Sequence, residues 1–221
     1  MDTTQSEISR NIIKSGTSIV GIVCKDGVVL GGDRRTTAGG QIVMSKRSQK
    51  VVKINGYVAV AGAGVSSDID LYQRVFTSEL KLKELKTKSR PSIKEAANLF
   101  GMMAYRNIRT PSMIPSIVGT LIAGFNEDGT TELYTVEPAG GVYRVDDYDA
   151  NFGSGFQFIL GLLERTYKKD ISVKEGIELA KECIKAAIER DTASGNGIDI
   201  FSITKDGVKQ VVSEELVPHY K

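Results

Sequence analysis

The sequence has few of the residues on which histidine-dependent and metal-dependent catalysis is built. Its 221 residues include one histidine, His219, two cysteines, Cys24 and Cys183, and no tryptophan. A Ser–His–Asp or Cys–His site needs a positioned imidazole to take the proton of the nucleophile, and His219 stands almost at the C-terminal end. One histidine cannot form a zinc site of two or three histidines, and the cysteines lack CxxC spacing. We therefore expect neither a metal nor a cofactor.

Other shortages exclude further classes of protein. The formal net charge is only +2, with acidic and basic residues interspersed, which argues against a nucleic-acid partner. No apolar run approaches the roughly 18 residues that span a bilayer, so no membrane partner is expected. No GxxxxGK[ST] loop for a nucleotide phosphate is present. The two separated cysteines are typical of small core residues in a reducing compartment, and the expected location is the cytoplasm.

Turn signals between alternating apolar runs predict antiparallel hairpins. Asp26-Gly27, Asn55-Gly56 and Asp206-Gly207 each supply a positive-φ turn between two strand-like segments. A further group of three strands is expected over residues 116–150, where the turns NEDG and PAGG separate the apolar runs. The sheets should therefore be antiparallel.

Between these strands the apolar residues change to a helical period, and the helices come in two pairs. Two of the four helices begin with a capping box, formed by Ser92 with Glu95 and by Ser172 with Glu175. The expected helices span residues 65–86, 92–109, 156–169 and 172–190.

The order of elements is strands, helix pair, strands, helix pair, strands. Helices that occur in pairs, rather than singly between strands, argue against a doubly wound fold. We predict an α+β fold, a four-layer αββα sandwich of two antiparallel sheets flanked by helix pairs. Without a break in composition, residues 17–221 are expected to form one domain.

The start of the chain raises a question of chemistry. The first sixteen residues, MDTTQSEISRNIIKSG, carry little core material and lack the apolar stretch of roughly 7 to 15 residues of a secretory signal. An α-amino group titrates near ~7.7–8.0 and can act as a general base. Cleavage of Gly16–Thr17 would make Thr17 both nucleophile and base. The alternative, which this stretch alone favours, is a simple loop entering a strand.

Several blocks then resemble one family in order and separation. GTSIVGIVCKDGVVLGGDRRTTAGG resembles the start of proteasome β-type subunits, and SQKVVKI, the AGAG turn into a helix, FGSGF and RDTASGNGIDI resemble its later blocks. The resemblance covers residues 14–212 and looks more archaeal than eukaryotic. It implies the N-terminal nucleophile hydrolase fold, threonine-type endopeptidase activity on unfolded polypeptides, and a propeptide, residues 1–16, removed by autolysis between Gly16 and Thr17.

The resemblance also implies a set of site residues. Thr17 matches the nucleophile, and Gly64 matches the backbone donor of the oxyanion hole. Lys50 matches the catalytic lysine. Lys46 is the alternative, because the chain between Asp33 and this lysine is one residue longer than in some relatives. Thr37, Gly64 and Ser66 match positions that pair with an extended substrate. The other matched catalytic residues are Asp33, Lys50, Ser154, Asp191 and Ser194.

The resemblance places a specificity pocket beside Thr17. Gly62 at its floor would leave room and Asp70 would add negative charge, so we expect cleavage after Arg or Lys. The matched pocket residues are Thr36, Ser48, Val52, Gly62, Ser66 and Asp70.

The resemblance finally implies an assembly. Its members form stacked seven-membered rings with α subunits and other β subunits, with fourteen β subunits in each particle and an unfoldase ATPase acting through the α ring. Two alternatives stay open: a structural or latent, unprocessed β subunit in a mixed ring, and a different N-terminal nucleophile hydrolase such as an amidase.

Overall fold

The structure is a computed structural model, and it describes residues 16–112 and 116–216. Most of the expected propeptide, residues 1–15, and His219 lie outside the described residues.

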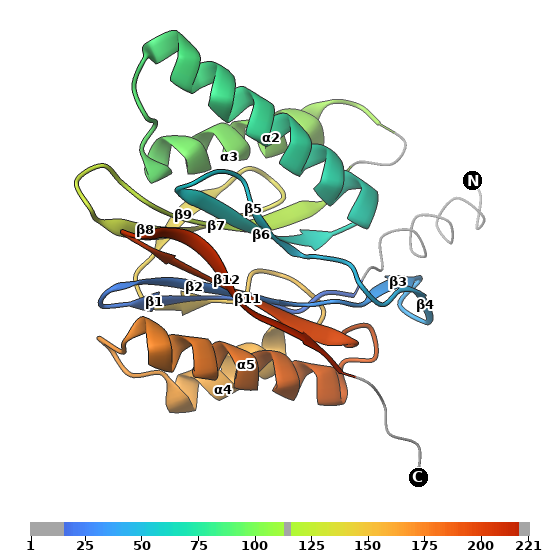
Figure 1. The fold of residues 1–221 in the computed structure, drawn as a ribbon. Helices are drawn as coiled ribbons and strands as arrows, with labels where there is room; N and C mark the ends of the chain where they lie inside the picture. The colour runs from blue at the N-terminus through green and yellow to red at the C-terminus, as the bar shows by residue number, and fades with distance from the viewer. Residues whose placement is uncertain (1–15, 113–115, 217–221) are drawn as a thin grey trace.

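Two five-stranded sheets form the centre of the molecule, and every strand pair in them is antiparallel (Figure 1). The first sheet has the order β10 (Tyr148–Asp149), β1 (Ile19–Cys24), β2 (Gly27–Asp33), β11 (Gly197–Thr204) and β12 (Gly207–Glu215). The second has the order β5 (Val51–Lys53), β6 (Val58–Gly64), β7 (Val118–Phe125), β8 (Thr131–Val136) and β9 (Val142–Val145).

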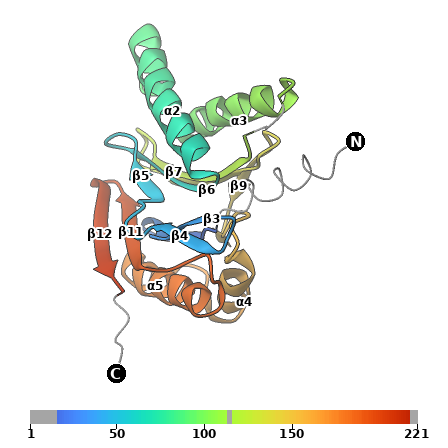
Figure 2. The ribbon, with the colours of Figure 1, turned by 90° about the vertical axis from the view of Figure 1, so that its right-hand side faces the viewer.

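A small hairpin, β3 (Thr36–Ala38) and β4 (Ile42–Ser45), lies at one end of the sandwich, the end that Figure 2 faces. It follows β2 directly in the chain, and β5 begins a few residues after it. The hairpin therefore marks the end of the sheets at which the predicted Thr17, Asp33 and Lys50 converge.

The helices form the two outer layers. Helices α2 (Ser66–Thr87) and α3 (Ile93–Arg109) cover the second sheet, and α4 (Phe156–Thr166) and α5 (Val173–Arg190) cover the first (Figures 1 and 2). Both predicted capping boxes are present, at the starts of α3 and α5.

Three separate hydrophobic clusters fill the spaces between the four layers. Successive side chains of β2 point to opposite faces of its sheet, so this strand contributes to two of the clusters. Val28 and Leu30 face the other sheet, whereas Val29 packs under the helices. The predicted αββα sandwich is therefore confirmed. Cys24 and Cys183 are both free and buried, as the sequence predicts.

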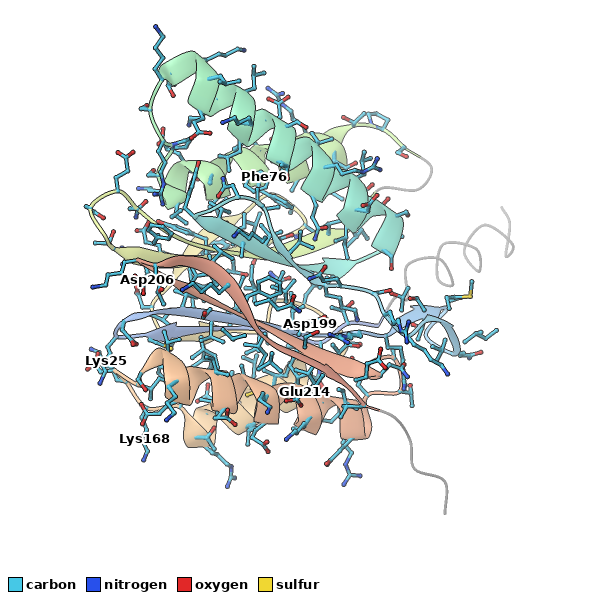
Figure 3. All side chains as sticks on the ribbon, viewed as in Figure 1. Lys25, Phe76, Lys168, Asp199, Asp206 and Glu214 are labelled. Atoms are coloured by element: carbon cyan, nitrogen blue, oxygen red, sulfur yellow. The ribbon has the colours of Figure 1, made fainter. Side chains whose placement is uncertain are left out.

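The upper helical layer depends on a few large side chains. Phe76 is fully buried, makes an edge contact with Phe100 at 5.2 Å between ring centroids, and lies on the sheet-facing side of α2 (Figure 3). We expect Phe76→Ala to lower the free energy of unfolding by about 3–5 kcal/mol, because it removes an aromatic ring from a packed core. Urea unfolding of the purified chain measures this. Leu85→Ala on the same helix is the control, since Leu85 is 63% exposed. Equal losses for the two variants would contradict this packing.

Candidate active site

Thr17 is buried immediately before β1, and its polar atoms are all engaged. Its hydroxyl donates to the Gly16 carbonyl oxygen at 2.7 Å, and its backbone N–H donates to Ser154 Oγ at 3.0 Å. The backbone N–H of Gly155 donates to the Thr17 carbonyl at 3.2 Å. A Cβ on Gly16 would lie 1.8 Å from the Cβ of Ala193, so only glycine fits before Thr17 in this conformation.

Lys50 and Asp33 form a buried ion pair beside this peptide bond. The Lys50 Nζ donates to Asp33 Oδ1 at 2.6 Å and to the Gly16 carbonyl oxygen at 3.0 Å. Asp33 is fully buried and Lys50 is 6% exposed, so the pair is not a surface salt bridge. Lys46, the alternative lysine, is exposed in the loop after β4. The structure thus brings Lys50 to Asp33.

Burial governs the protonation of Lys50. Loss of solvent lowers the pKa of the Lys50 ammonium below its ordinary value, and the Asp33 carboxylate offsets this only in part. The lysine can therefore donate a hydrogen bond to the Gly16 carbonyl oxygen while holding its proton less tightly than a solvated lysine.

A second polar group meets the backbone nitrogen of Thr17. Ser154 Oγ donates to Asp191 Oδ2 at 2.5 Å, and Ser194 Oγ donates to the same oxygen at 2.6 Å. The hydroxyls of Ser18 and Ser194 lie 2.8 Å apart. Asp191 is the C-cap residue of α5, so the end of this helix delivers the carboxylate. The six predicted catalytic residues therefore converge on the Gly16–Thr17 bond.

A cavity of about 190 Å³ opens beside Thr17. Of the predicted pocket residues, Thr36, Ser48, Ser66 and Asp70 line it. Val52 and Gly62 are not among the lining residues. A Cβ on Gly62 would lie 2.7 Å from Ile69 Cγ2, so the side chain of Ile69 stands in front of this glycine.

Sequence reasoning missed three residues of the cavity wall, Gln49, Ile69 and Gln73. Together with Ser66 and Asp70, two of them follow the i, i+3, i+4, i+7 spacing of one helix face, which is the signal that could have found them. Asp70 also forms an ion pair with Arg74 at 2.9 Å, one turn further along α2.

Two further predicted residues, Thr37 and Gly64, are not among the residues that line the cavity. Thr37 Oγ1 accepts a hydrogen bond from the backbone N–H of Gly16 at 3.3 Å, so β3 contacts the segment before the nucleophile. Gly64 ends β6 with φ +136°, where a Cβ would lie 2.1 Å from the Ile117 carbonyl oxygen. The backbone conformation of Gly64 and the close approach of Ile117 therefore require glycine at this position.

Cavity size does not locate this site. A larger cavity, of about 630 Å³, includes Lys25 and Asp206 in its wall and lies at the opposite end of the sandwich from β3 and β4 (Figure 3). Within residues 16–112 and 116–216, no group of His, Cys, Asp and Glu side chains is arranged to hold a metal ion. None of the described helices has the length and apolar character needed to cross a membrane.

Two antiparallel sheets between helix pairs form the fold of the N-terminal nucleophile hydrolases, and a buried threonine, lysine and aspartate meet at one end of it. Residues 13–203 match the family model described as proteasome subunit, and the chain belongs to that family. It is 38% identical to the proteasome subunit beta of Nanoarchaeum equitans, over 90% of this chain and 98% of that one. It is 39% identical to proteasome subunit beta 2 of Pyrococcus abyssi, over 91% and 93%. These β-type archaeal relatives identify it with the hydrolases of protein degradation.

The lowered pKa of Lys50 has a consequence for stability. The unfolded chain keeps this proton up to the ordinary lysine pKa, whereas the folded chain releases it earlier, so the contribution of Lys50 to stability rises with pH in that alkaline window. We expect the difference in unfolding free energy between wild type and Lys50→Met to shift in favour of wild type from pH 7.5 to 9.5. The upper limit is about 1.4 kcal/mol per pH unit.

Urea unfolding at the two pH values measures this difference, with Lys94→Met, at an exposed position of α3, as the control for removing a positive charge. A shift toward the variant would mean that Asp33 outweighs desolvation and raises the pKa of Lys50.

Proposed function

We propose that this chain is a catalytic β subunit of a 20S proteasome core, a threonine-type endopeptidase with Thr17 as its nucleophile. The observation that carries the proposal is the buried Lys50–Asp33 pair. Its ammonium donates a hydrogen bond to the Gly16 carbonyl oxygen, which also accepts one from the Thr17 hydroxyl. The mature catalytic domain is then residues 17–221, and residues 1–16 are a propeptide.

The first step is self-cleavage of Gly16–Thr17. The Thr17 oxygen attacks the Gly16 carbonyl carbon, and the Lys50 ammonium, at 3.0 Å, stabilises the charge that develops on the carbonyl oxygen. The C–N bond breaks and the hydroxyl proton goes to the departing Thr17 nitrogen, which leaves an ester between Gly16 and Thr17. Water hydrolyses this ester, so that Gly16 gains a carboxylate and Thr17 regains its hydroxyl with a free α-amino group.

The second step is hydrolysis of the substrate. The free amine of Thr17 takes the hydroxyl proton, and Ser154 and Asp191 hold that amine through the contacts they make in the uncut chain. Lys50, oriented by Asp33, favours the deprotonated hydroxyl. The backbone N–H of Gly64 donates a hydrogen bond to the oxyanion. One such donor stabilises the transition state by ~2.7–4 kcal/mol in other hydrolases.

The substrate is an unfolded polypeptide in extended form. Thr37, Gly64 and Ser66 pair with its backbone as an added strand, which requires a chain without its own tertiary structure. The cavity beside Thr17 has a mostly polar wall, with one carboxylate, Asp70, one ammonium, Lys50, and one aliphatic side chain, Ile69. Lys50 is paired with Asp33, which offsets its charge, whereas Asp70 lies on the exposed face of α2. This wall supports a preference for a basic residue before the cleaved bond.

The proposed assembly is the family's particle. The chain forms seven-membered rings with itself or with other β subunits, stacked against rings of α subunits, and an unfoldase ATPase delivers substrate through the α ring in the cytoplasm. The second candidate is a latent subunit that keeps its propeptide in a mixed ring. The engaged Gly16 carbonyl and buried Thr17 of the uncut chain are also compatible with that candidate.

Self-cleavage is tested by the intact mass of the chain after co-assembly with its α subunits. We expect the wild-type mass to begin at Thr17 and the mass of Thr17→Ala to retain residues 1–16, because alanine has no hydroxyl to attack Gly16. Thr17→Ser should be cut. A wild-type chain that stays uncut inside the particle would support the latent subunit instead.

The basic preference is tested with fluorogenic peptides that differ only in the residue before the cleaved bond. We expect Asp70→Asn to lower the ratio of basic to aliphatic turnover about 10-fold, equivalent to ~1.4 kcal/mol. Arg74→Gln should raise that ratio a few-fold, because an exposed ion pair contributes ~0–1 kcal/mol and its loss frees Asp70 for the substrate. Faster turnover of aliphatic than basic peptides by wild type would refute the preference.

A further inference from the structure

The candidate site is assembled from two groups of side chains on separate parts of the chain. Asp33 and Lys50 lie at the ends of β2 and β5, whereas Asp191 and Ser194 lie in the connection between α5 and β11. Catalysis by Thr17 requires both groups at once, because one acts on its hydroxyl and the other on its nitrogen. Some contact must therefore set their separation.

Backbone contacts to Asp33 provide part of this link. Asp33 Oδ2 accepts hydrogen bonds from the backbone N–H of Arg35 and from that of Gly195, both at 2.9 Å. The aspartate thus joins the end of β2 to the loop of residues 191–196, which we call the 191–196 loop.

The pairing of Asp33 with Ile198 in the β2–β11 ladder holds the base of the loop, and the side chain of Arg35 adds a further link. Its Nη1 donates to the Thr192 carbonyl oxygen and its Nε donates to Asn196 Oδ1, each at 2.8 Å. One planar guanidinium therefore grips the 191–196 loop on both sides of Ser194. The fork geometry of arginine suits two acceptors at fixed positions, and lysine cannot reproduce it.

Gly195 allows the Arg35 guanidinium to pack directly against the backbone of the 191–196 loop. A Cβ at this position would lie 2.5 Å from Arg35 Nη2 and 2.7 Å from Arg35 Cζ, so the guanidinium packs directly against the glycine backbone. Gly195 has φ +151° and Asn196 has φ +66°, so the loop follows a path that ordinary side chains rarely adopt.

The neighbouring arginine has a different partner and supplies a matched comparison. Arg34 donates to Asp199 through Nε at 3.0 Å and through Nη2 at 2.5 Å. Asp199 lies on β11 (Figure 3) and also accepts from Gln210 Nε2 at 2.8 Å. The side chain of Arg34 therefore joins the strands of the first sheet. Its backbone N–H donates to the Gly195 carbonyl oxygen at 3.1 Å, a bond that a substitution of the side chain leaves in place.

We propose that Arg35 is a positioning residue that clamps the 191–196 loop to Asp33 and so sets the geometry of Asp191 and Ser194 around the nitrogen of Thr17. The inference rests on the proposed function of the chain as a threonine-type endopeptidase. Arg35 acts through these residues: its guanidinium donates to the 191–196 loop, and Arg35 is not among the residues that line the cavity. Burial is the main cause of the lowered pKa of Lys50, and the positive charge of Arg35 contributes in the same direction.

The kinetic test uses the assembled particle with Arg35→Ala, Arg35→Lys and the paired control Arg34→Gln/Asp199→Asn. We expect Arg35→Ala to lower kcat about 10- to 100-fold with little change in KM, since small displacements of catalytic groups cost rates of this order. Millimolar guanidinium should restore part of the kcat of Arg35→Ala. Arg35→Lys should remain impaired, and the control pair should keep its kcat and show no response to guanidinium.

Amide hydrogen exchange of the same particles tests the clamp independently of enzymatic activity. The amides of Ala193, Ser194 and Gly195 are all hydrogen-bonded in this structure. We expect Arg35→Ala to speed their exchange and guanidinium to slow it again, with the control pair unchanged. Unchanged exchange in Arg35→Ala, or an equal kcat loss in the control pair, would overturn the clamp. A wild-type particle that cuts no peptide would refute the proposed function, while the exchange result would still decide the role of Arg35.

Discussion

A buried ion pair between Lys50 and Asp33 is the interaction on which the rest of the site depends. Removing two charges from water is costly, and their attraction offsets the cost only when the remaining hydrogen-bonding capacity is satisfied. Asp33 meets this condition with the backbone N–H groups of Ser18, Arg35 and Gly195 in addition to the Lys50 ammonium. These donors belong to the entry to β1, the end of β2 and the loop before β11. The hydrogen bonds that stabilise this one buried carboxylate therefore hold three segments of the chain around Thr17.

Glycines let those segments approach closely enough to enclose Thr17. A Cβ on Gly153 would lie 2.3 Å from the Thr17 carbonyl oxygen, and one on Gly155 would lie 2.0 Å from Ser18 Oγ. Gly16 meets Ala193 in the same way from the other side. The glycine-rich stretches at this end of the molecule thus have a packing cause, because two segments can meet at the Gly16–Thr17 bond only where a glycine leaves out the side chain.

Chemistry and selectivity lie on different elements of the fold. The groups around Thr17 come from strand ends and loops, whereas one face of the first two turns of α2, with Ile69 and Asp70, forms much of the cavity wall. Lys50, directly before β5, lines the same cavity. In the proposed endopeptidase, substitutions on that face of α2 change the cavity wall without changing the hydrogen bond between Lys50 and Asp33.

Local physics, readable in the sequence by itself, determined the order of elements, because turn dipeptides, capping boxes such as Ser92 with Glu95, and the period of apolar residues act over a few neighbours. The lack of a usable imidazole pointed to Thr17, and the family resemblance supplied its partners. The resemblance also chose Lys50 over Lys46, and the structure brings Lys50 to Asp33. Only the tertiary structure decided that Ile69 stands before Gly62 and that Arg35 reaches the 191–196 loop. Both contacts depend on how side chains from distant segments of the chain pack together. Neither the spacing of residues in the sequence nor its composition determines that packing.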